Sequence, residues 1–186
     1  AAGNSFTCKS CSSRSSSTCT GVDQICDDGV ATCEQTVARF DLGGPAPSFQ
    51  VFKNCSKVPC KNYNFSKSAG GLSDQLRREC CVKDKCNDEP ITLPPRNNTP
   101  NDRVCMSCFE QKDYKCQTIG MMNCTGDEFY CVDFQALVDL QGGNPMQVRA
   151  LGCTNTPNCD PPPTFPQELV ISDQKMTCTQ ARKYCD

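Results

Sequence analysis

Cys80-Cys81-Val82-Lys83-Asp84-Lys85-Cys86-Asn87 ends the first of two similar halves of this chain. From the first cysteine, Cys8, forward to Cys80, successive cysteines are separated by 2, 7, 6, 6, 21, 4 and 19 residues. In the second half the separations before Cys178 are 2, 7, 7, 6, 21, 5 and 18 residues. Seven consecutive separations agree within one residue, so the chain holds two copies of one cysteine framework of about 80 to 90 residues, a normal small-domain size.

The composition indicates why so many cysteines are present. Cysteine makes up 19 of the 186 residues, a density typical of a disulfide scaffold. A reducing compartment would keep these thiols open, so we expect a secreted, extracellular protein. Hydrophobic residues amount to 37% and tryptophan is absent, so cross-links are expected to replace part of an apolar core. The chain opens without a basic, apolar leader, which predicts a mature product whose signal peptide has been removed.

Residue counts exclude several classes of function. The chain has no histidine, which excludes Ser-His-Asp and Cys-His catalysis and zinc sites that use imidazole. Nineteen basic against 21 acidic residues leave a net charge of -2, which gives no electrostatic footprint for nucleic acid. No apolar run approaches the roughly 20 residues that cross a bilayer. We therefore expect a protein that is not an enzyme, with no cofactor, no nucleic-acid partner and no transmembrane segment.

A proline-bearing stretch separates the two copies. It runs from Asp88 to Asn101 and has no periodic apolar face, which is typical of an extended, semi-rigid connector. The sequence thus predicts domain 1 over residues 1–93, a linker over 94–101 and domain 2 over 102–186.

The 21-residue separation in each copy predicts a β-hairpin. In the first copy, Thr36–Phe40 and Phe49–Phe52 flank a loop with paired glycines followed by proline. In the second copy, Val132–Val138 and Met146–Arg149 flank a similar loop. Such loops between β-branched and aromatic runs are a hairpin signal. Because helical periodicity is weak throughout, we predict an all-β, disulfide-rich fold.

The ending Cys80-Cys81-x4-Cys86-Asn87, after an opening Cys8-x-x-Cys11, resembles the three-finger fold of snake toxins and the urokinase-receptor superfamily. The resemblance covers nearly the whole chain and implies two tandem three-finger domains, each with β-hairpins projecting from a cluster of disulfides.

The second copy departs from this pattern. Thr179 stands in place of the second cysteine of the Cys-Cys pair, and Asp186 in place of the terminal asparagine. Cys185 therefore loses its family partner. We expect Cys185 to be free or capped, to bond another molecule and so form an oligomer, or to pair differently within domain 2.

The disulfide pairing is implied by the resemblance, because spacing alone does not select one connectivity. The implied pairs are Cys8–Cys33, Cys11–Cys19, Cys26–Cys55, Cys60–Cys80, Cys81–Cys86, Cys105–Cys131, Cys108–Cys116, Cys124–Cys153 and Cys159–Cys178.

Two secreted branches of the superfamily with tandem copies are similar to this chain: the γ-type phospholipase A2 inhibitors and the sodefrin-precursor-like courtship factors. The motifs that resemble them are Ser16–Gly21, Pro94–Thr99, Asn123–Gly126, Leu151–Cys153 and Cys178–Lys183. The resemblance implies a protein that binds another protein, with a secreted phospholipase A2 as the first partner. The alternatives are a pheromone-like signal for a cell-surface or chemosensory receptor, and a structural component of a mucus, foam or skin secretion.

Motifs that suggest metal or redox chemistry fit structural roles better. The Cys-x-x-Cys pairs at Cys8–Cys11 and Cys105–Cys108 lie inside complete disulfide frameworks. Asp27-Asp28 and Asp127-Glu128 lack the alternating oxygen ligands of a calcium loop. We therefore predict no metal site and no catalytic residues.

Four sites satisfy the N-glycosylation rule: Asn54, Asn64, Asn97 and Asn123. Two of them have a cysteine at the central position, where disulfide closure competes with glycosylation. Asn64 and Asn97 are therefore the favoured acceptors.

Surface recognition remains as a function, and apolar residues beside the two central hairpin loops are the candidate partner-binding anchors. They are Phe40, Leu42, Pro45, Pro47, Phe49, Leu140, Pro145 and Met146. The alternative for the aromatic rings and Leu140 is that they pack across the sheet.

Overall fold

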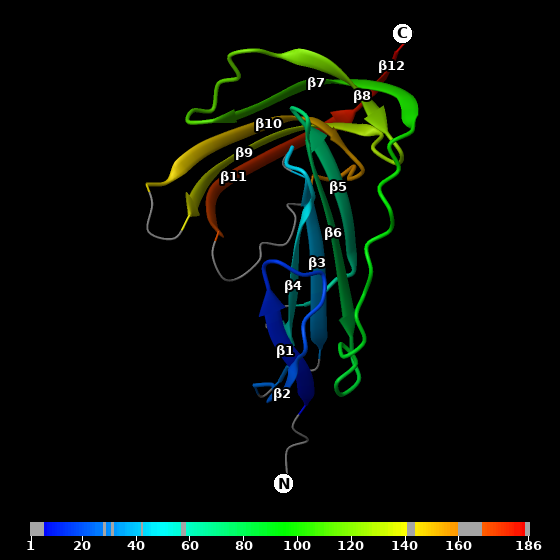
Figure 1. Cartoon of the computed structure of the whole chain (residues 1–186), viewed down its shortest axis with the longest axis vertical. Coiled ribbons are helices and arrows are strands. Elements are labelled where there is room, and N and C mark those ends of the chain that lie inside the picture. The colour runs from blue at the N-terminus through cyan, green and yellow to red at the C-terminus, as the bar shows by residue number, and fades with distance from the viewer. Residues whose placement is uncertain are drawn as a thin grey trace. The chain divides into compact units, whose positions relative to one another are not determined.

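The computed structural model describes residues 6–27, 29–30, 32–41, 43–56, 59–140, 144–159 and 169–184. Strands and no helices occur among these residues, so the prediction of an all-β, disulfide-rich fold is confirmed (Figure 1). Within the described part of the chain, no helix has the length and hydrophobicity of a membrane span.

The described residues form twelve strands, and β7 begins at Pro100, within the stretch predicted as the linker. They are β1 (Thr7–Ser13), β2 (Val22–Ile25), β3 (Cys33–Asp41), β4 (Ser48–Cys55), β5 (Tyr63–Ala69), β6 (Leu72–Cys81), β7 (Pro100–Gln111), β8 (Gly120–Thr125), β9 (Tyr130–Leu140), β10 (Met146–Thr154), β11 (Leu169–Gln180) and β12 (Arg182–Lys183). The two predicted hairpins are β3–β4 and β9–β10. Each observed strand is longer than its predicted core because pairing continues to the cysteines at the base of the hairpin.

The chain forms two compact units. The first unit comprises Ala1–Asn64 and Gln75–Pro94, and the second comprises Phe65–Asp74 and Pro95–Asp186. The division after Pro94 lies one residue from the end of the predicted domain 1. The turn end of the β5–β6 hairpin belongs to the second unit, which the sequence did not predict.

In the first unit the strand order is β6-β3-β4-β1-β2. The β3–β4 hairpin is antiparallel from the pair Cys33 and Cys55 to the pair Phe40 and Ser48. Strand β2 pairs with β1 alone among the described strands, so it forms one edge of this sheet.

In the second unit β11, β9 and β10 are successive neighbours, and β7 pairs with β10, β8 and β12. Strand β10 also pairs with β5 through three positions, from Gly152 opposite Ala69 to Thr154 opposite Lys67. The segment Phe65–Asp74 is thereby held in the second unit by backbone pairing.

Cystine sulfurs form much of the interior of both units. Among the described residues nine disulfides are present, and they join the same nine pairs that the family resemblance implies. The remaining cysteine, Cys185, lies outside the described residues. The buried cluster of the first unit is composed of Cys8, Cys26, Cys33 and Cys55. Cross-links therefore occupy positions that large apolar side chains take in most domains.

Asn87 explains why asparagine follows the last cysteine of the first copy. Its side chain is buried; Nδ2 donates to the carbonyl oxygens of Lys9 (2.9 Å) and Glu34 (3.1 Å), and Oδ1 accepts from the Lys9 amide (2.9 Å). One amide group thus connects the end of the domain to β1 and β3.

Candidate binding surfaces

The predicted anchors of the first central hairpin do not form one exposed patch. Phe40 and Phe49 are partly buried, and they lie one position out of register on paired strands, so their rings are on opposite faces of the hairpin. Pro45 is exposed and Pro47 is partly buried. Leu42 lies outside the described residues.

In the second central hairpin, Pro145 is exposed, and Met146 is partly buried opposite Val138. The backbone of Leu140 pairs with Leu169 of β11, while its side chain is outside the described part of the structure. Partner binding by these hairpin residues therefore stays a prediction.

Two of the exposed apolar side chains of the first unit lie on the edge strand β2, and a third, Val82, follows β6. Val22 is 71% exposed and Ile25 is 68% exposed. Between them, the Asp23 carboxylate contacts Lys9 Nζ at 2.8 Å and Lys85 Nζ at 2.5 Å. Hydrogen bonds from Lys85 and Lys9 lower the pKa of Asp23 below its ordinary value. This edge strand therefore presents apolar groups beside an ion-pair cluster of one carboxylate and two amines.

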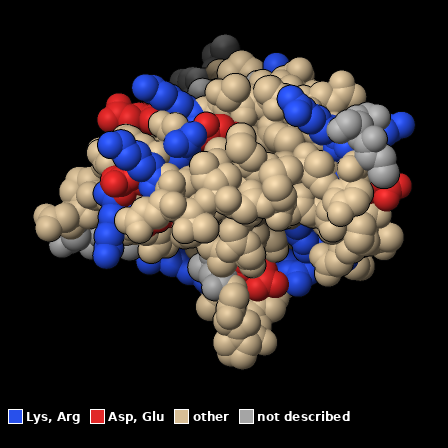
Figure 2. Space-filling view, turned by 90° about the horizontal axis from the view of Figure 1, so that it is seen from above, with Lys and Arg blue, Asp and Glu red and all other residues tan. Residues whose placement is uncertain are grey.

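The second unit carries a larger set of exposed apolar side chains. Met106 on β7 and Met121 on β8 lie directly opposite each other and are 56% and 67% exposed; Ile119 is 51% exposed. All three line a cleft of about 580 Å³. On the face of the molecule in Figure 2, charged residues lie toward the margins and a broad uncharged area lies between them.

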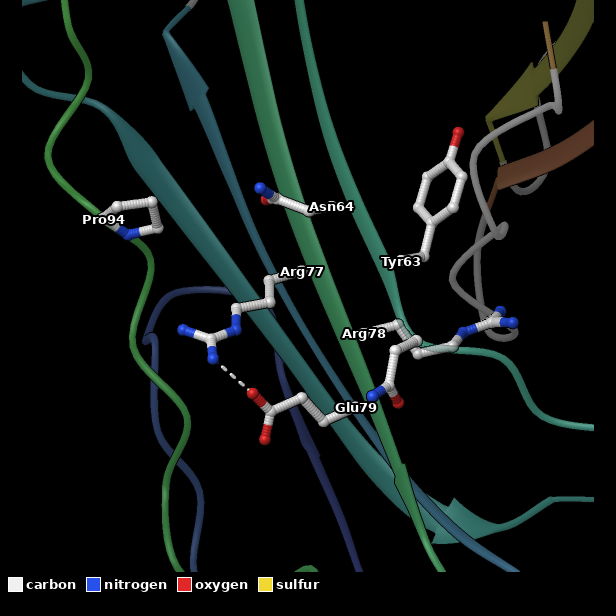
Figure 3. Close-up of a pocket in the computed structure, with 7 residues that line it drawn as sticks. Tyr63, Asn64, Arg77, Arg78, Glu79 and Pro94 are labelled. Carbon is white, nitrogen blue, oxygen red and sulfur yellow. Dashed lines mark hydrogen bonds and ion pairs between the residues drawn. The ribbon is translucent and has the colours of Figure 1, made fainter. Parts of the chain in front are cut away.

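A groove of about 350 Å³ lies in the first unit, beside Pro94, the first residue of the linker (Figure 3). Arg77 and Glu79 point toward each other and form an ion pair, while Arg78 of the same strand points away. Arg77 Nη1 also donates to the Thr92 carbonyl at 2.9 Å. The guanidinium is thus compensated, and its role here is to hold the segment before Pro94 against β6.

The four sequons differ in the environment of the acceptor asparagine. Asn64 is exposed and lines the groove of Figure 3. Asn97 is exposed, and its Oδ1 accepts a hydrogen bond from the Thr99 amide at 3.0 Å. Asn54 is partly buried, with Oδ1 accepting from the Cys55 amide, whereas Asn123 is exposed. Exposure at Asn64 and Asn97 is compatible with glycan attachment, and their occupancy stays a prediction.

The sequence did not predict that the side chains of Lys53 and Gln35 are buried. Lys53 is 2% exposed, and its Nζ donates to the Asp88 carbonyl at 2.5 Å; burial lowers the pKa of this amine. Gln35 is equally buried, and its amide, oriented to satisfy both contacts, bonds the backbone of Glu89 and Ile91 at 2.9 Å each. Together they fix the segment after the last disulfide of the first unit.

The second unit contains a buried carboxylate. Glu128 is 2% exposed; Oε2 accepts from Ser68 Oγ at 2.7 Å and Oε1 lies 3.2 Å from Arg96 Nη2. Arg96 also donates to Ser68 Oγ. Burial raises the pKa of Glu128, and the contacts with Ser68 and Arg96 oppose that rise. Of the adjacent acidic residues, Asp127 is therefore exposed to solvent and Glu128 is buried, where its contacts with Ser68 and Arg96 stabilise the fold.

In the described part of the chain, the sulfurs of three cysteines come close together in each of two places. Cys8, Cys26 and Cys55 form one group, and the corresponding sulfurs of the second unit form another. Every member is in a disulfide, and a disulfide sulfur lacks the thiolate character that a metal ligand needs. The proximity reflects two cystines crossing at the base of each sheet.

The cleft of the second unit was also missed by sequence reasoning. The sequence offers only a weak indication of it. Met106 and Met121 each lie within three residues of a cysteine, and an apolar residue in that position is ordinarily predicted to be part of the core. The strand register places them on the exposed face instead.

Comparison with known proteins identifies both halves of the chain. The u-PAR/Ly-6 domain model matches residues 4–89 and 101–186. RoBo-1 of Rattus norvegicus is 27% identical over 111 residues, which cover 58% of this chain and 44% of RoBo-1. This chain thus spans less than half the length of that relative. The crystal structure of mouse TEX101 aligns over 96% of this chain and 99% of that chain, with 18% identity and a TM-score of 0.44.

Proposed function

Because the chain belongs to the u-PAR/Ly-6 domain family, we propose that it is an extracellular, non-enzymatic protein that binds another protein. Proteins of this family are typically binding proteins outside the cell or at its surface. The cysteine content supports the extracellular assignment, since the disulfides of this scaffold require an oxidising compartment. The absence of histidine supports a function in binding rather than hydrolysis.

The observation that carries this proposal is that Val22 and Ile25, which lie on opposite faces of an edge strand anchored by disulfides, are both exposed, so a partner that covers this edge contacts both side chains. All four residues of β2 are exposed, and β1, its paired strand, contains Cys8 and Cys11, both in cystines. Apolar side chains on a rigid element lose little conformational freedom when a partner covers them, so they make efficient anchors.

The specific activity we propose first is inhibition of a secreted phospholipase A2, as in the γ-type inhibitors that the tandem cysteine framework resembles. A pheromone-like signal is the second candidate, because motifs such as Pro94–Thr99 and Cys178–Lys183 resemble the courtship factors as well as the inhibitors.

A panel of secreted phospholipases A2 tests the proposal. The purified full chain at micromolar concentration is expected to bind and inhibit at least one member. Replacing Val22 and Ile25 by Ser should weaken that binding by about tenfold or more, while the neighbouring Gln24→Ser control should not. If every member of the panel stays unbound and uninhibited, the inhibitor proposal fails and signalling takes its place. Turnover of phospholipid by the protein itself would contradict the non-enzymatic assignment.

A further inference from the structure

The cleft of the second unit has an apolar wall built from strands β7, β8 and β10 and from the residue before β8. Met106 and Met121 lie side by side across β7 and β8, Ile119 precedes β8, and Val104 and Leu151 line the same cleft. Its volume of about 580 Å³ lies in the range of sites that hold small molecules, about 300 to 1,000 Å³. Methionine side chains adapt to ligands of irregular shape. The wall therefore suits a flexible alkyl chain.

The charged groups that line the cleft are not equally compensated. Arg149 forms a two-point ion pair with Asp133, with Nε to Oδ1 at 3.1 Å and Nη2 to Oδ2 at 2.8 Å, and its Nη1 donates to the Tyr114 carbonyl at 3.1 Å. This pair is electrically neutral and its donors are used. It has little capacity left for a ligand.

Arg182 differs from Arg149. It lies on β12 opposite Val104, so its backbone adjoins the apolar wall, and its side chain is exposed. Over the described ranges, the Arg182 guanidinium makes no hydrogen bond or ion pair. Thr177 and Thr179 line the same cleft and add hydroxyl groups. One uncompensated cation beside apolar side chains is complementary to an anion that carries an apolar chain.

We propose that this cleft binds a single-chain carboxylate amphiphile, that is, a fatty acid. Its alkyl chain lies along Met106, Ile119 and Met121, and its carboxylate pairs with Arg182. A binding mode on an anionic membrane is less favoured, because recognition of anionic lipid surfaces uses clusters of about four to eight basic residues. Neighbouring Arg103 is already engaged with the Ala181 carbonyl at 3.0 Å. The proposal is independent of the proposed protein partner.

Calorimetric titration of the full chain with dodecanoate below its micelle concentration tests this inference. Wild-type protein is expected to bind dodecanoate, and Arg182→Gln to weaken binding by about tenfold or more, as expected for a lost charge-assisted pair. Met121→Ser should weaken binding by about threefold to tenfold through lost apolar contact. Two matched controls should bind as the wild type does: Lys183→Gln removes the adjacent charge, and Val82→Ser changes an equally exposed apolar residue of the first unit.

Two further ligands, a cationic amphiphile and an anionic vesicle, decide between ligand classes. Dodecyltrimethylammonium has the same tail and the opposite charge, and it should bind at least about tenfold more weakly than dodecanoate. No binding of dodecanoate up to about 1 mM, or equal loss in Arg182→Gln and Lys183→Gln, would overturn the inference. So would tight binding to phosphatidylglycerol vesicles without binding of monomeric dodecanoate, which would assign the surface to a membrane.

Discussion

Gly152 of β10 is the position at which one added methyl group should disturb the second unit most. A Cβ at this position would lie 1.7 Å from the Ser68 carbonyl oxygen and 2.8 Å from Ala69 Cα. Carbon-to-oxygen contacts between adjacent strands are ordinarily about 3.3 Å or longer. The backbone of β5 would therefore have to move by about 1.6 Å in Gly152→Ala, which is enough to break its hydrogen bonds.

The loss of local stability in Gly152→Ala can be estimated from the hydrogen bonds that hold Ser66 and Ser68. Thr154 Oγ1 donates to the Ser66 carbonyl at 2.8 Å, and the Ser66 amide donates to Asn155 Oδ1 at 2.9 Å. Ser68 Oγ donates to the Glu128 carboxylate at 2.7 Å. Two neutral bonds at about 1 kcal/mol each and one bond to a charged acceptor at about 2 kcal/mol give about 4 kcal/mol.

Hydrogen exchange measured by mass spectrometry on a peptide covering residues 66–70 is the assay. A local loss of about 4 kcal/mol should lower the protection of these amides by about a thousandfold. Gly120→Ala is the matched control, since its added Cβ meets nothing within 4 Å. If Gly152→Ala left protection in this segment equal to that of the control, the close approach of β5 to β10 would be wrong.

Three other outcomes are expected. Burial raises the pKa of Glu128, so the stability that protonation of Glu128 contributes is present below about pH 4.5 and is lost as pH rises through the raised pKa. Glu128→Gln should therefore flatten the pH dependence of the urea unfolding midpoint from about pH 4.5 up to the raised pKa. An unchanged pH profile would refute this. Asn87→Ala should lower the unfolding free energy of the first unit by about 3 kcal/mol, because three backbone groups lose a buried partner, and equal urea midpoints for variant and wild type would contradict it. Non-reducing peptide mapping should recover Cys124 joined to Cys153, a bond worth about 3 to 4 kcal/mol, and recovery of either cysteine with another partner would overturn the pairing.

Local chemistry made the strands predictable. The paired glycines and prolines after Phe40 and Val138 indicate loops, and the alternating β-branched residues beside them indicate paired strands. The observed hairpins extend these predicted cores to the cysteines that close them. Hairpin signals lie within about 20 residues, so no tertiary information is needed to read them.

The buried polar groups could not be predicted in the same way. From the sequence, Lys53 is expected at the surface. It is buried, and its amine donates a hydrogen bond to the carbonyl of Asp88, which lies 35 residues later in the chain. Glu128 lies in an acidic pair that reads as a solvated turn, yet Ser68 and Arg96 reach it from distant parts of the chain. The location of Phe65–Asp74 depends on the missing side chain of Gly152. Such contacts are set by tertiary packing and leave no periodic pattern in the sequence.

The second unit has a sulfur-rich interior and several large apolar side chains at its surface. In the second unit the buried cluster consists of Cys105, Cys124, Cys153 and Ala181. Val132, Val148 and Leu151 are buried as well, so this unit combines a small apolar core with long-range cystines worth about 3 to 4 kcal/mol each.

Binding and stability should therefore separate in this unit. Replacing Met106 and Met121 by Ser is expected to change the unfolding free energy by less than about 0.5 kcal/mol per site, because both side chains are already more than half exposed. The same double variant should lose dodecanoate binding. Urea unfolding and calorimetric titration on one preparation measure both quantities. A loss of stability above about 2 kcal/mol would mean that the two methionines belong to the core, and the cleft would then be a packing feature rather than a ligand site.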